Sequence, residues 1–240
     1  MSRFVAGHFF NISVLIKKIF KYQFYHLILL LILLGIIVFY INNTSRLSVG
    51  NFWGISTKTW FWIALIVPVL HQIYVWLVWR LELYGNIFTG KFGIKKAFLF
   101  YSAGFSILFI SRLVFIIILA ISNSNTLFVN PFWAYLFAVI ITPPIIYLEY
   151  SVKKYFTVER AFGIDHFDKN FNKPFVKEGI FRYINNAMYV VGLMVLYLPG
   201  LLLLSEAALV AALFNHIYIW VHYYTTELPD IKEIYKNVNY

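Results

Sequence analysis

The sequence predicts an all-α polytopic membrane protein of about six transmembrane helices, the last two of them joined as a C-terminal helical hairpin. Hydrophobic residues make up 61% of the 240-residue chain and charged residues only 12%, about half the charged fraction of a typical soluble domain. The apolar residues form long runs, and the charged residues fall between those runs. The absence of cysteine excludes disulfides, zinc–thiolate sites and a cysteine nucleophile.

Each apolar run is assigned to one or two crossings by its length, because a transmembrane helix needs about 20 largely apolar residues. Four runs are predicted to cross once: 26–41, 60–79, 97–121 and 131–150. The last run, 187–224, has 38 residues without lysine or arginine, which is too long for one crossing and right for two. We expect its turn at Ser205-Glu206. The alternative, Pro199-Gly200, would leave a first arm only a dozen residues long.

The lysine and arginine residues test the topology of these six crossings. Six crossings place both termini on one side, and that side then carries 17 of the 20 basic residues. The opposite side carries only Arg46 and Lys58, and Arg112 falls inside a span. By the positive-inside rule, both termini and the 151–186 loop are expected to be cytoplasmic. The net charge of +10 therefore indicates topology and a lipid surface, and we predict no nucleic-acid partner.

Two polar clusters bracket the final apolar run. The stretch FRYINNAMYVVG (181–192) precedes its first arm, and YYTTELPDIKEIYK (223–236) follows its second arm. Because a hairpin brings its two open ends together, these clusters should meet at the cytoplasmic interface. In the last helix, Asn215, Tyr218 and His222 share one stripe, which should face the protein interior because polar groups are costly in lipid.

These clusters carry a resemblance to a known family. Asn186-Ala187-Met188-Tyr189 corresponds to an N-P-M-Y motif, and Glu227-Leu228-Pro229 corresponds to E-E-P. With this spacing, residues 160–240 resemble the phosphatidylethanolamine N-methyltransferases, which belong to a wider group with the isoprenylcysteine carboxyl methyltransferases. The chain departs from the pattern where Ala187 replaces the proline, Leu228 the second glutamate and Asn186 the histidine of the wider group. Gly192 falls one residue later than the motif glycine.

The resemblance implies an integral-membrane, S-adenosylmethionine-dependent methyltransferase that acts on a lipid amine, with phosphatidylethanolamine as the expected acceptor. The expected catalytic residues are His222, as proton acceptor, and Glu227. Asp165 and Glu227 are the alternative proton acceptors. The residues expected to bind the cofactor are Arg182, Asn186, Tyr189, Gly192, Tyr223 and Glu227, because a carboxylate suits the ammonium or sulfonium charge and an aromatic ring can pack against it.

The domain organisation follows from the same resemblance. Residues 91–240 are expected to form the methyltransferase-like membrane core. Residues 1–90 are expected to add a surface segment and two accessory transmembrane helices, since 4–25 is apolar with interspersed lysines. The protein should lie in a bacterial inner membrane or in a eukaryotic endomembrane or mitochondrial membrane. We expect no metal site.

A second interpretation belongs to another class of function. The departures from the motif are also consistent with a non-catalytic, methyltransferase-like subunit of a larger membrane assembly, which would have other membrane subunits as partners. Binding of S-adenosylmethionine at the cytoplasmic end of the hairpin would separate the two interpretations.

Overall fold

The fold is a bundle of antiparallel helices, described by a computed structural model over residues 12–171 and 174–236. The N-terminal elements are α1 (Ile12–Ile19), α2 (Gln23–Asn42), β1 (Asn51–Phe52), β2 (Ile55–Ser56), α3 (Thr57–Gly85) and α4 (Thr89–Phe92). The remaining elements are α5 (Ile94–Ser122), α6 (Pro131–Ser151), α7 (Val158–Ala161), α8 (Ala187–Val190), α9 (Leu198–Leu202), α10 (Glu206–His222) and α11 (Leu228–Ile234). The two short strands pair antiparallel, with Asn51 opposite Ser56.

Within the described residues, four helices are long and apolar enough to cross a membrane. They are Ile12–Asn42, Thr57–Gly85, Ile94–Ser122 and Pro131–Phe156. These helices contain the four single-crossing runs predicted from the sequence, so the all-α membrane architecture is confirmed. Of the predicted N-terminal surface segment, the part before residue 12 lies outside the described residues, and the rest includes α1.

The predicted C-terminal hairpin forms, with arms 187–202 and α10. The first arm is short for a span, but Gly192–Tyr197 within it is a 3₁₀ helix of 6 residues. Since a 3₁₀ helix rises about 2.0 Å per residue and an α-helix about 1.5 Å, the arm is about 27 Å long. The hydrocarbon core is about 30 Å thick. Whether these two arms complete a total of six spans stays a prediction.

The turn of the hairpin lies at Ser205, as predicted. Ser205 caps α10, because its side chain accepts a hydrogen bond from the amide of Ala208, and Glu206 places a negative charge in the first turn, where the helix dipole favours it. The rival site, Pro199-Gly200, lies inside α9. Gly200 is needed there for close packing, since a Cβ on it would lie 2.8 Å from the Leu209 side chain.

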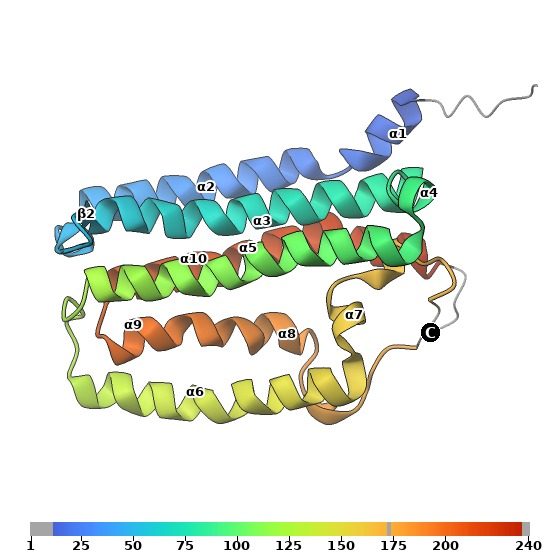
Figure 1. The fold of residues 1–240 in the computed structure, drawn as a ribbon. Coiled ribbons are helices and arrows are strands. Elements are labelled where there is room, and N and C mark those ends of the chain that lie inside the picture. The colour runs from blue at the N-terminus through green and yellow to red at the C-terminus, as the bar shows by residue number, and fades with distance from the viewer. Residues whose placement is uncertain (1–11, 172–173, 237–240) are drawn as a thin grey trace, which may run out of the picture.

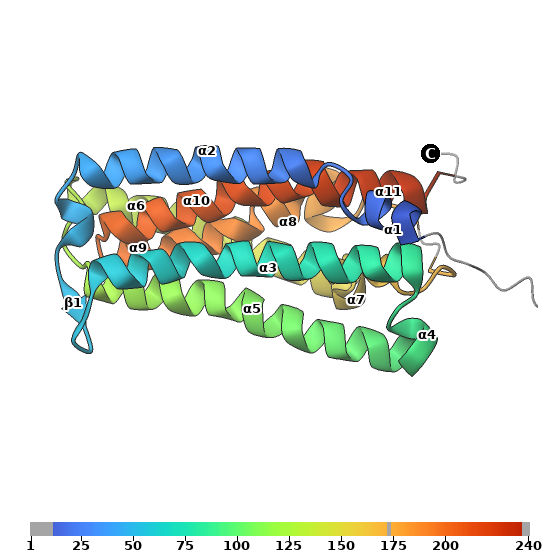
Figure 2. The ribbon, with the colours of Figure 1, turned by 90° about the horizontal axis from the view of Figure 1, so that it is seen from above.

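Helix α10 is the centre of the bundle. It packs against α2, α3, α5 and the first arm of the hairpin, and Figures 1 and 2 show it enclosed by these elements. Four alanines of α10 are fully buried, namely Ala207, Ala208, Ala211 and Ala212. Small side chains let helices approach closely in a membrane, where no hydrophobic effect drives them together. The polar residues Asn215, Tyr218 and His222 are also buried, so the predicted stripe faces the interior.

One polar pair lies in the interior of the bundle. The Arg112 Nε atom donates a hydrogen bond to Asn215 Oδ1 at 3.0 Å, between the middle of α5 and α10. His71 of α3 is also buried, but its ring packs edge-on against Phe105, with centroids 4.7 Å apart. No hydrogen bond to His71 is present in the described part of the chain. The pair therefore joins α5 to α10, and His71 packs as an aromatic ring.

The two ends of the bundle give a direct test of orientation. Lys58 is exposed at the start of α3, beside the β-hairpin, and Lys169 is exposed in the loop after α7 at the opposite end. Lys58→Cys and Lys169→Cys place single thiols in a chain that has none. A membrane-impermeant maleimide is expected to label position 58 only from the outside and position 169 only from the cytoplasmic side. Labelling of both positions from one side would contradict the predicted topology.

Candidate functional site

A cavity of about 470 Å³ lies at the end of the bundle that carries α1, α7 and α11. Its walls come from the end of α3, from the segment between α6 and α8, from the turn after α10 and from α11. A volume of this size is typical of a small-molecule site. Both ends of the C-terminal hairpin therefore open into the same cavity.

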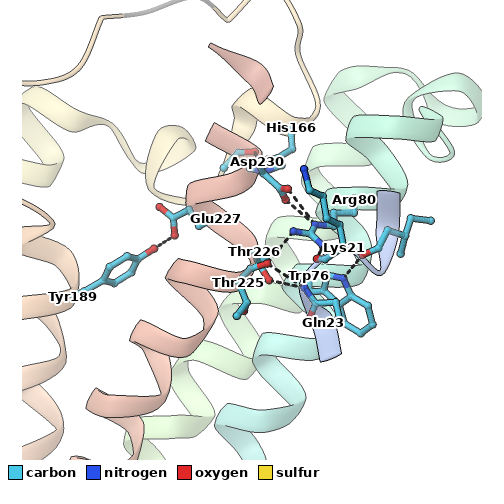
Figure 3. Close-up of polar contacts among 12 residues, drawn as sticks. Lys21, Gln23, Trp76, Arg80, His166, Tyr189, Thr225, Thr226, Glu227 and Asp230 are labelled. Carbon is cyan, nitrogen blue, oxygen red and sulfur yellow. Dashed lines mark hydrogen bonds and ion pairs between the residues drawn. The ribbon is translucent and has the colours of Figure 1, made fainter. Parts of the chain in front are cut away.

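The two polar clusters predicted to be neighbours meet across this cavity. Asn186, Tyr189, Tyr223 and Glu227 all line it. The Tyr189 hydroxyl donates a hydrogen bond to the Glu227 carboxylate, although the two residues lie 38 positions apart, and Figure 3 shows the contact bridging the two arms. The Tyr189 and Tyr223 rings pack edge to face with centroids 5.8 Å apart. The predicted proximity of Tyr189 to Glu227 is therefore confirmed.

Glu227 lies beyond the end of α10, on a π-helical turn that spans Tyr223–Glu227. The amide of Leu228 donates to the Tyr223 carbonyl, five residues back, where an α-helix would use a carbonyl four residues back. Such widened turns are rare and occur frequently at functional sites. Pro229 sits in the first turn of α11, where its missing N–H is not needed. The local sequence thus ends α10 and restarts a helix within a few residues.

The environment of Glu227 changes its acidity. Burial raises the pKa of Glu227 to about 7, and the hydrogen bond from Tyr189 opposes this rise by stabilising the carboxylate. Nearby charges have smaller effects on the same pKa: His166 lowers it, and Asp165 and Asp230 raise it. Glu227 can therefore gain or lose a proton near neutral pH, as a general acid or base must.

The cavity lining combines aromatic rings with charged groups of both signs. The aromatic residues are Trp79, Phe156, Phe175, Phe181, Tyr189, Tyr223 and Tyr235, the carboxylates are Asp165 and Glu227, and the basic residues are Arg160 and Lys177. Aromatic faces and carboxylates both attract organic cations. The lining is suited to a ligand that carries a sulfonium or ammonium group together with an anionic group.

A second carboxylate faces the cavity from the loop after α7. Asp165 Oδ2 accepts a hydrogen bond from the Tyr235 hydroxyl at 2.5 Å. Its other oxygen, Oδ1, is buried without a hydrogen-bond partner in the described part of the chain. A buried carboxylate oxygen without a donor is costly, so Asp165 Oδ1 is suited to accept a hydrogen bond from a ligand.

Trp79 of α3 forms a wall that sequence reasoning missed. Its indole stacks on the His166 ring with centroids 4.0 Å apart. Gly163 makes this contact possible, because it has a φ of +81° and a Cβ there would lie 2.6 Å from the indole Cε2. Tryptophan near a helix end is common in membrane proteins as an interface anchor. The sequence around Trp79 therefore carries no signal that separates a cavity wall from such an anchor.

Three residues expected at the site do not line the cavity. Arg182 is exposed at the end of a short 3₁₀ turn. Gly192 packs on α6, where a Cβ would lie 3.1 Å from Leu148 Cδ2. His222 is 1% exposed and lies behind Trp79, with ring centroids 6.0 Å apart. Neither ring nitrogen of His222 has a hydrogen-bond partner among the described residues.

Metal ligation has no support in the described residues, in which no group of three or more His, Cys, Asp and Glu side chains is placed to hold an ion. His166 instead lies near Asp230, with Nε2 3.8 Å from Oδ2.

The C-terminal part of the chain is similar to a known protein family. Residues 133–238 match the family model described as phospholipid methyltransferase. The match runs from the start of α6 to α11, so it includes the whole C-terminal hairpin and the loop that forms most of the cavity wall. No curated protein and no solved structure matches the chain significantly.

Proposed function

We propose, from the premise that residues 133–238 belong to the phospholipid methyltransferase family, that this membrane protein transfers a methyl group from S-adenosylmethionine to the amine of a phospholipid. The expected acceptor is phosphatidylethanolamine. The observation that carries the proposal is the contact of Tyr189 with Glu227 in a cavity lined by aromatic residues and carboxylates. This contact joins the two family motifs at the mouth of the hairpin.

The cavity residues fit the cofactor by their chemistry. Glu227 can face an ammonium or sulfonium charge, and Tyr189 and Tyr223 can pack against it. Lys177 and Arg160, which also line the cavity, can attract a carboxylate or a lipid phosphate. We assign this attraction to them in place of Arg182, because Arg182 lies outside the cavity. When bound, S-adenosylmethionine supplies an electrophilic methyl group.

The residues of the chain have three tasks in this reaction. They hold the amine in line with the methyl group, which supplies rate by positioning. They exclude water from the cavity. They also accept the proton of the lipid ammonium, because an ammonium has no lone pair. We assign proton acceptance to the carboxylates of Glu227 and Asp165, since they line the cavity and His222 does not.

The altered motif residues keep the backbone that the site needs. Ala187 is the first residue of α8, following Asn186 with a φ of +52°. Proline is favoured at the first helical position because its fixed φ fits a helix and its missing N–H is not needed there. Alanine can adopt the same φ, so it can replace the proline. Asparagine tolerates the left-handed conformation better than most residues. Loss of the motif proline is therefore compatible with an intact cavity.

The direct test uses purified protein in bilayers that contain phosphatidylethanolamine. S-adenosylmethionine binding by calorimetry and transfer of a labelled methyl group to lipid are both expected. Absence of binding at millimolar ligand would overturn the proposal and would favour the non-catalytic subunit. Binding without methyl transfer would contradict phosphatidylethanolamine as the acceptor.

Tyr189→Phe gives a prediction about pH. The change removes the hydrogen bond that lowers the pKa of Glu227, so this pKa should rise further above its wild-type value of about 7. A carboxylate binds a cation only when ionised, so cofactor affinity should increase as pH rises through this pKa. The increase should occur at higher pH in Tyr189→Phe than in wild type. Calorimetry across pH 6 to 8 measures the shift, and superimposable profiles would contradict it.

A further inference from the structure

Arg80 of α3 is buried in a set of contacts that reaches three other parts of the chain. Its side chain is 1% exposed. Nε lies 3.1 Å and 3.2 Å from the two carboxylate oxygens of Asp230, Nη1 donates to the carbonyls of Ile19 and Lys21, and Nη2 donates to the carbonyl of Thr225 at 3.0 Å. Figure 3 shows the guanidinium between these groups. One planar cation therefore joins the α1–α2 junction to the turn after α10 and to α11.

Two of these contacts flank Glu227 in the chain. Thr225 precedes it by two residues, and Asp230 follows it by three. Thr225 lies in the π-helical turn, and Asp230 lies in the first turn of α11. The guanidinium thus contacts the chain on both sides of Glu227, through the backbone carbonyl of Thr225 and the side chain of Asp230. The Glu227 side chain points away from Arg80 toward Tyr189.

Helix α2 supports the same turn from the same side. Gln23 Nε2 donates to Thr226 Oγ1 at 3.1 Å and to the Thr225 carbonyl at 3.4 Å. His26 Nδ1 lies 3.0 Å from Thr225 Oγ1. Gln23, His26 and Arg80 all precede residue 133, so the supporting residues lie outside the segment that matches the family model.

The physical need for this support comes from the π-helical turn itself. Such π-helical turns are rare in proteins, and loss of this one would advance the following residues by one helical position. One position in an α-helix corresponds to a rotation of about 100°. Such a rotation would carry the Glu227 carboxylate away from Tyr189 and out of the cavity. Side-chain donors to the Thr225 carbonyl and a partner for Asp230 hold the turn in its widened form.

We propose that Arg80 is a positioning residue for Glu227: it clamps the chain at Thr225 and Asp230, and so holds the Glu227 carboxylate against Tyr189 in the cavity. The proposal rests on the proposed function only where it links this geometry to cofactor affinity. The helices N-terminal to the family match are then part of the site, in addition to contributing Trp79 to its wall.

The test of the geometry needs no ligand. Arg80→Lys keeps the positive charge but lacks the planar guanidinium that contacts all four partner residues of Arg80. The measurement follows the carboxyl infrared band of Glu227 in full-length protein in bilayers, and this band is identified by its loss in Glu227→Gln. It is titrated with pH in protein that keeps Tyr189 and in protein that carries Tyr189→Phe. In the wild-type background, Tyr189→Phe should raise the titration midpoint. In the Arg80→Lys background the same change should leave the midpoint where it is, because the contact is already broken. An equal rise in both backgrounds would overturn the proposal.

A second measurement separates this proposal from the proposed function. Arg80→Lys should weaken S-adenosylmethionine binding about 10-fold in the wild-type background and less than about 2-fold in the Glu227→Gln background. The second loss should be smaller because, when one residue acts through another, the effects of the two substitutions on affinity do not add. Equal losses in both backgrounds would overturn the positioning role. If the wild-type protein binds no S-adenosylmethionine, only the proposed function is refuted. The positioning role of Arg80 is still tested by the infrared titration of Glu227, which needs no ligand.

Two further variants complete the design. Gln23→Ala removes the hydrogen bonds of Gln23 to Thr225 and Thr226 in the same turn. If Arg80→Lys does not fold, Gln23→Ala takes its place in both measurements. It should show the same loss of coupling to a smaller extent. Arg46→Lys is the matched control, because Arg46 pairs with Glu206 at 3.2 Å at the far end of the bundle. Arg46→Lys should leave both the titration midpoint of Glu227 and the affinity for S-adenosylmethionine unchanged. A change in either one would contradict the positioning role of Arg80.

Discussion

Glu227→Gln should weaken S-adenosylmethionine binding by about 10- to 150-fold. A hydrogen bond to a charged group contributes about 1.5–3 kcal/mol, and each 1.4 kcal/mol corresponds to a factor of ten in affinity. Glutamine keeps the size of the side chain and the capacity to accept from Tyr189, so the loss should report the charge. The effect should be measured by calorimetry at pH 8, above the pKa of about 7 at which Glu227 ionises.

The pH dependence and a matched control make this result specific. At pH 6 Glu227 is mostly protonated, so wild type and Glu227→Gln should converge. Glu206→Gln should leave affinity unaltered, because Glu206 lies at the opposite end of α10, where its partners are Tyr40 and Arg46. Undiminished affinity of Glu227→Gln at pH 8 would refute the assigned role of Glu227.

Asp230→Ala should lower the free energy of unfolding by about 3–5 kcal/mol. Asp230 and Arg80 are 0% and 1% exposed, and removal of one partner of a buried ion pair leaves the other charge uncompensated. The loss should appear as a lower unfolding midpoint in detergent or bilayers. It should exceed the effect of any surface substitution on α11.

Two comparisons test the cause of that loss. Arg80→Met with Asp230→Leu should recover much of the stability, because replacing a buried pair by apolar residues of similar volume is often neutral. Glu233→Ala breaks the ion pair of Glu233 with Lys236, in which the two side chains are 43% and 58% exposed. This change should lower the free energy of unfolding by at most about 1 kcal/mol. A loss for Asp230→Ala no larger than that of Glu233→Ala would show that the buried pair does not stabilise the fold.

The family match changes how the N-terminal region is understood. Residues 1–90 were expected to add a surface segment and accessory helices, and the family match begins only at residue 133. In the structure α2 and α3 contact α10, and α3 contributes Trp79 to the cavity. The domain boundary at residue 90 stays a prediction. The contacts indicate that the site depends on both sides of it.

Hydropathy and residue pattern were sufficient to predict the four long apolar helices and the C-terminal hairpin. Apolar length determines which segments can cross a bilayer, and the hydrogen bonds of each helix are internal, so no distant partner is needed to predict it. The turn at Ser205-Glu206 was predictable from the same run, because this acidic interruption divides it into two arms long enough to cross, whereas Pro199-Gly200 would leave a short first arm. The proximity of Tyr189 and Glu227 followed from the hairpin, whose two ends must meet.

Tertiary structure alone decided which side chains share the cavity and which of them are held in place. His222 and Glu227 are five residues apart, yet the π-helical turn and the Trp79 ring put one behind the wall and the other in the cavity. The contacts of Arg80 with Thr225 and Asp230 join residues about 150 positions apart. No local pattern encodes such contacts, because a buried cation is stable only where packing brings its partners from several helices to one point.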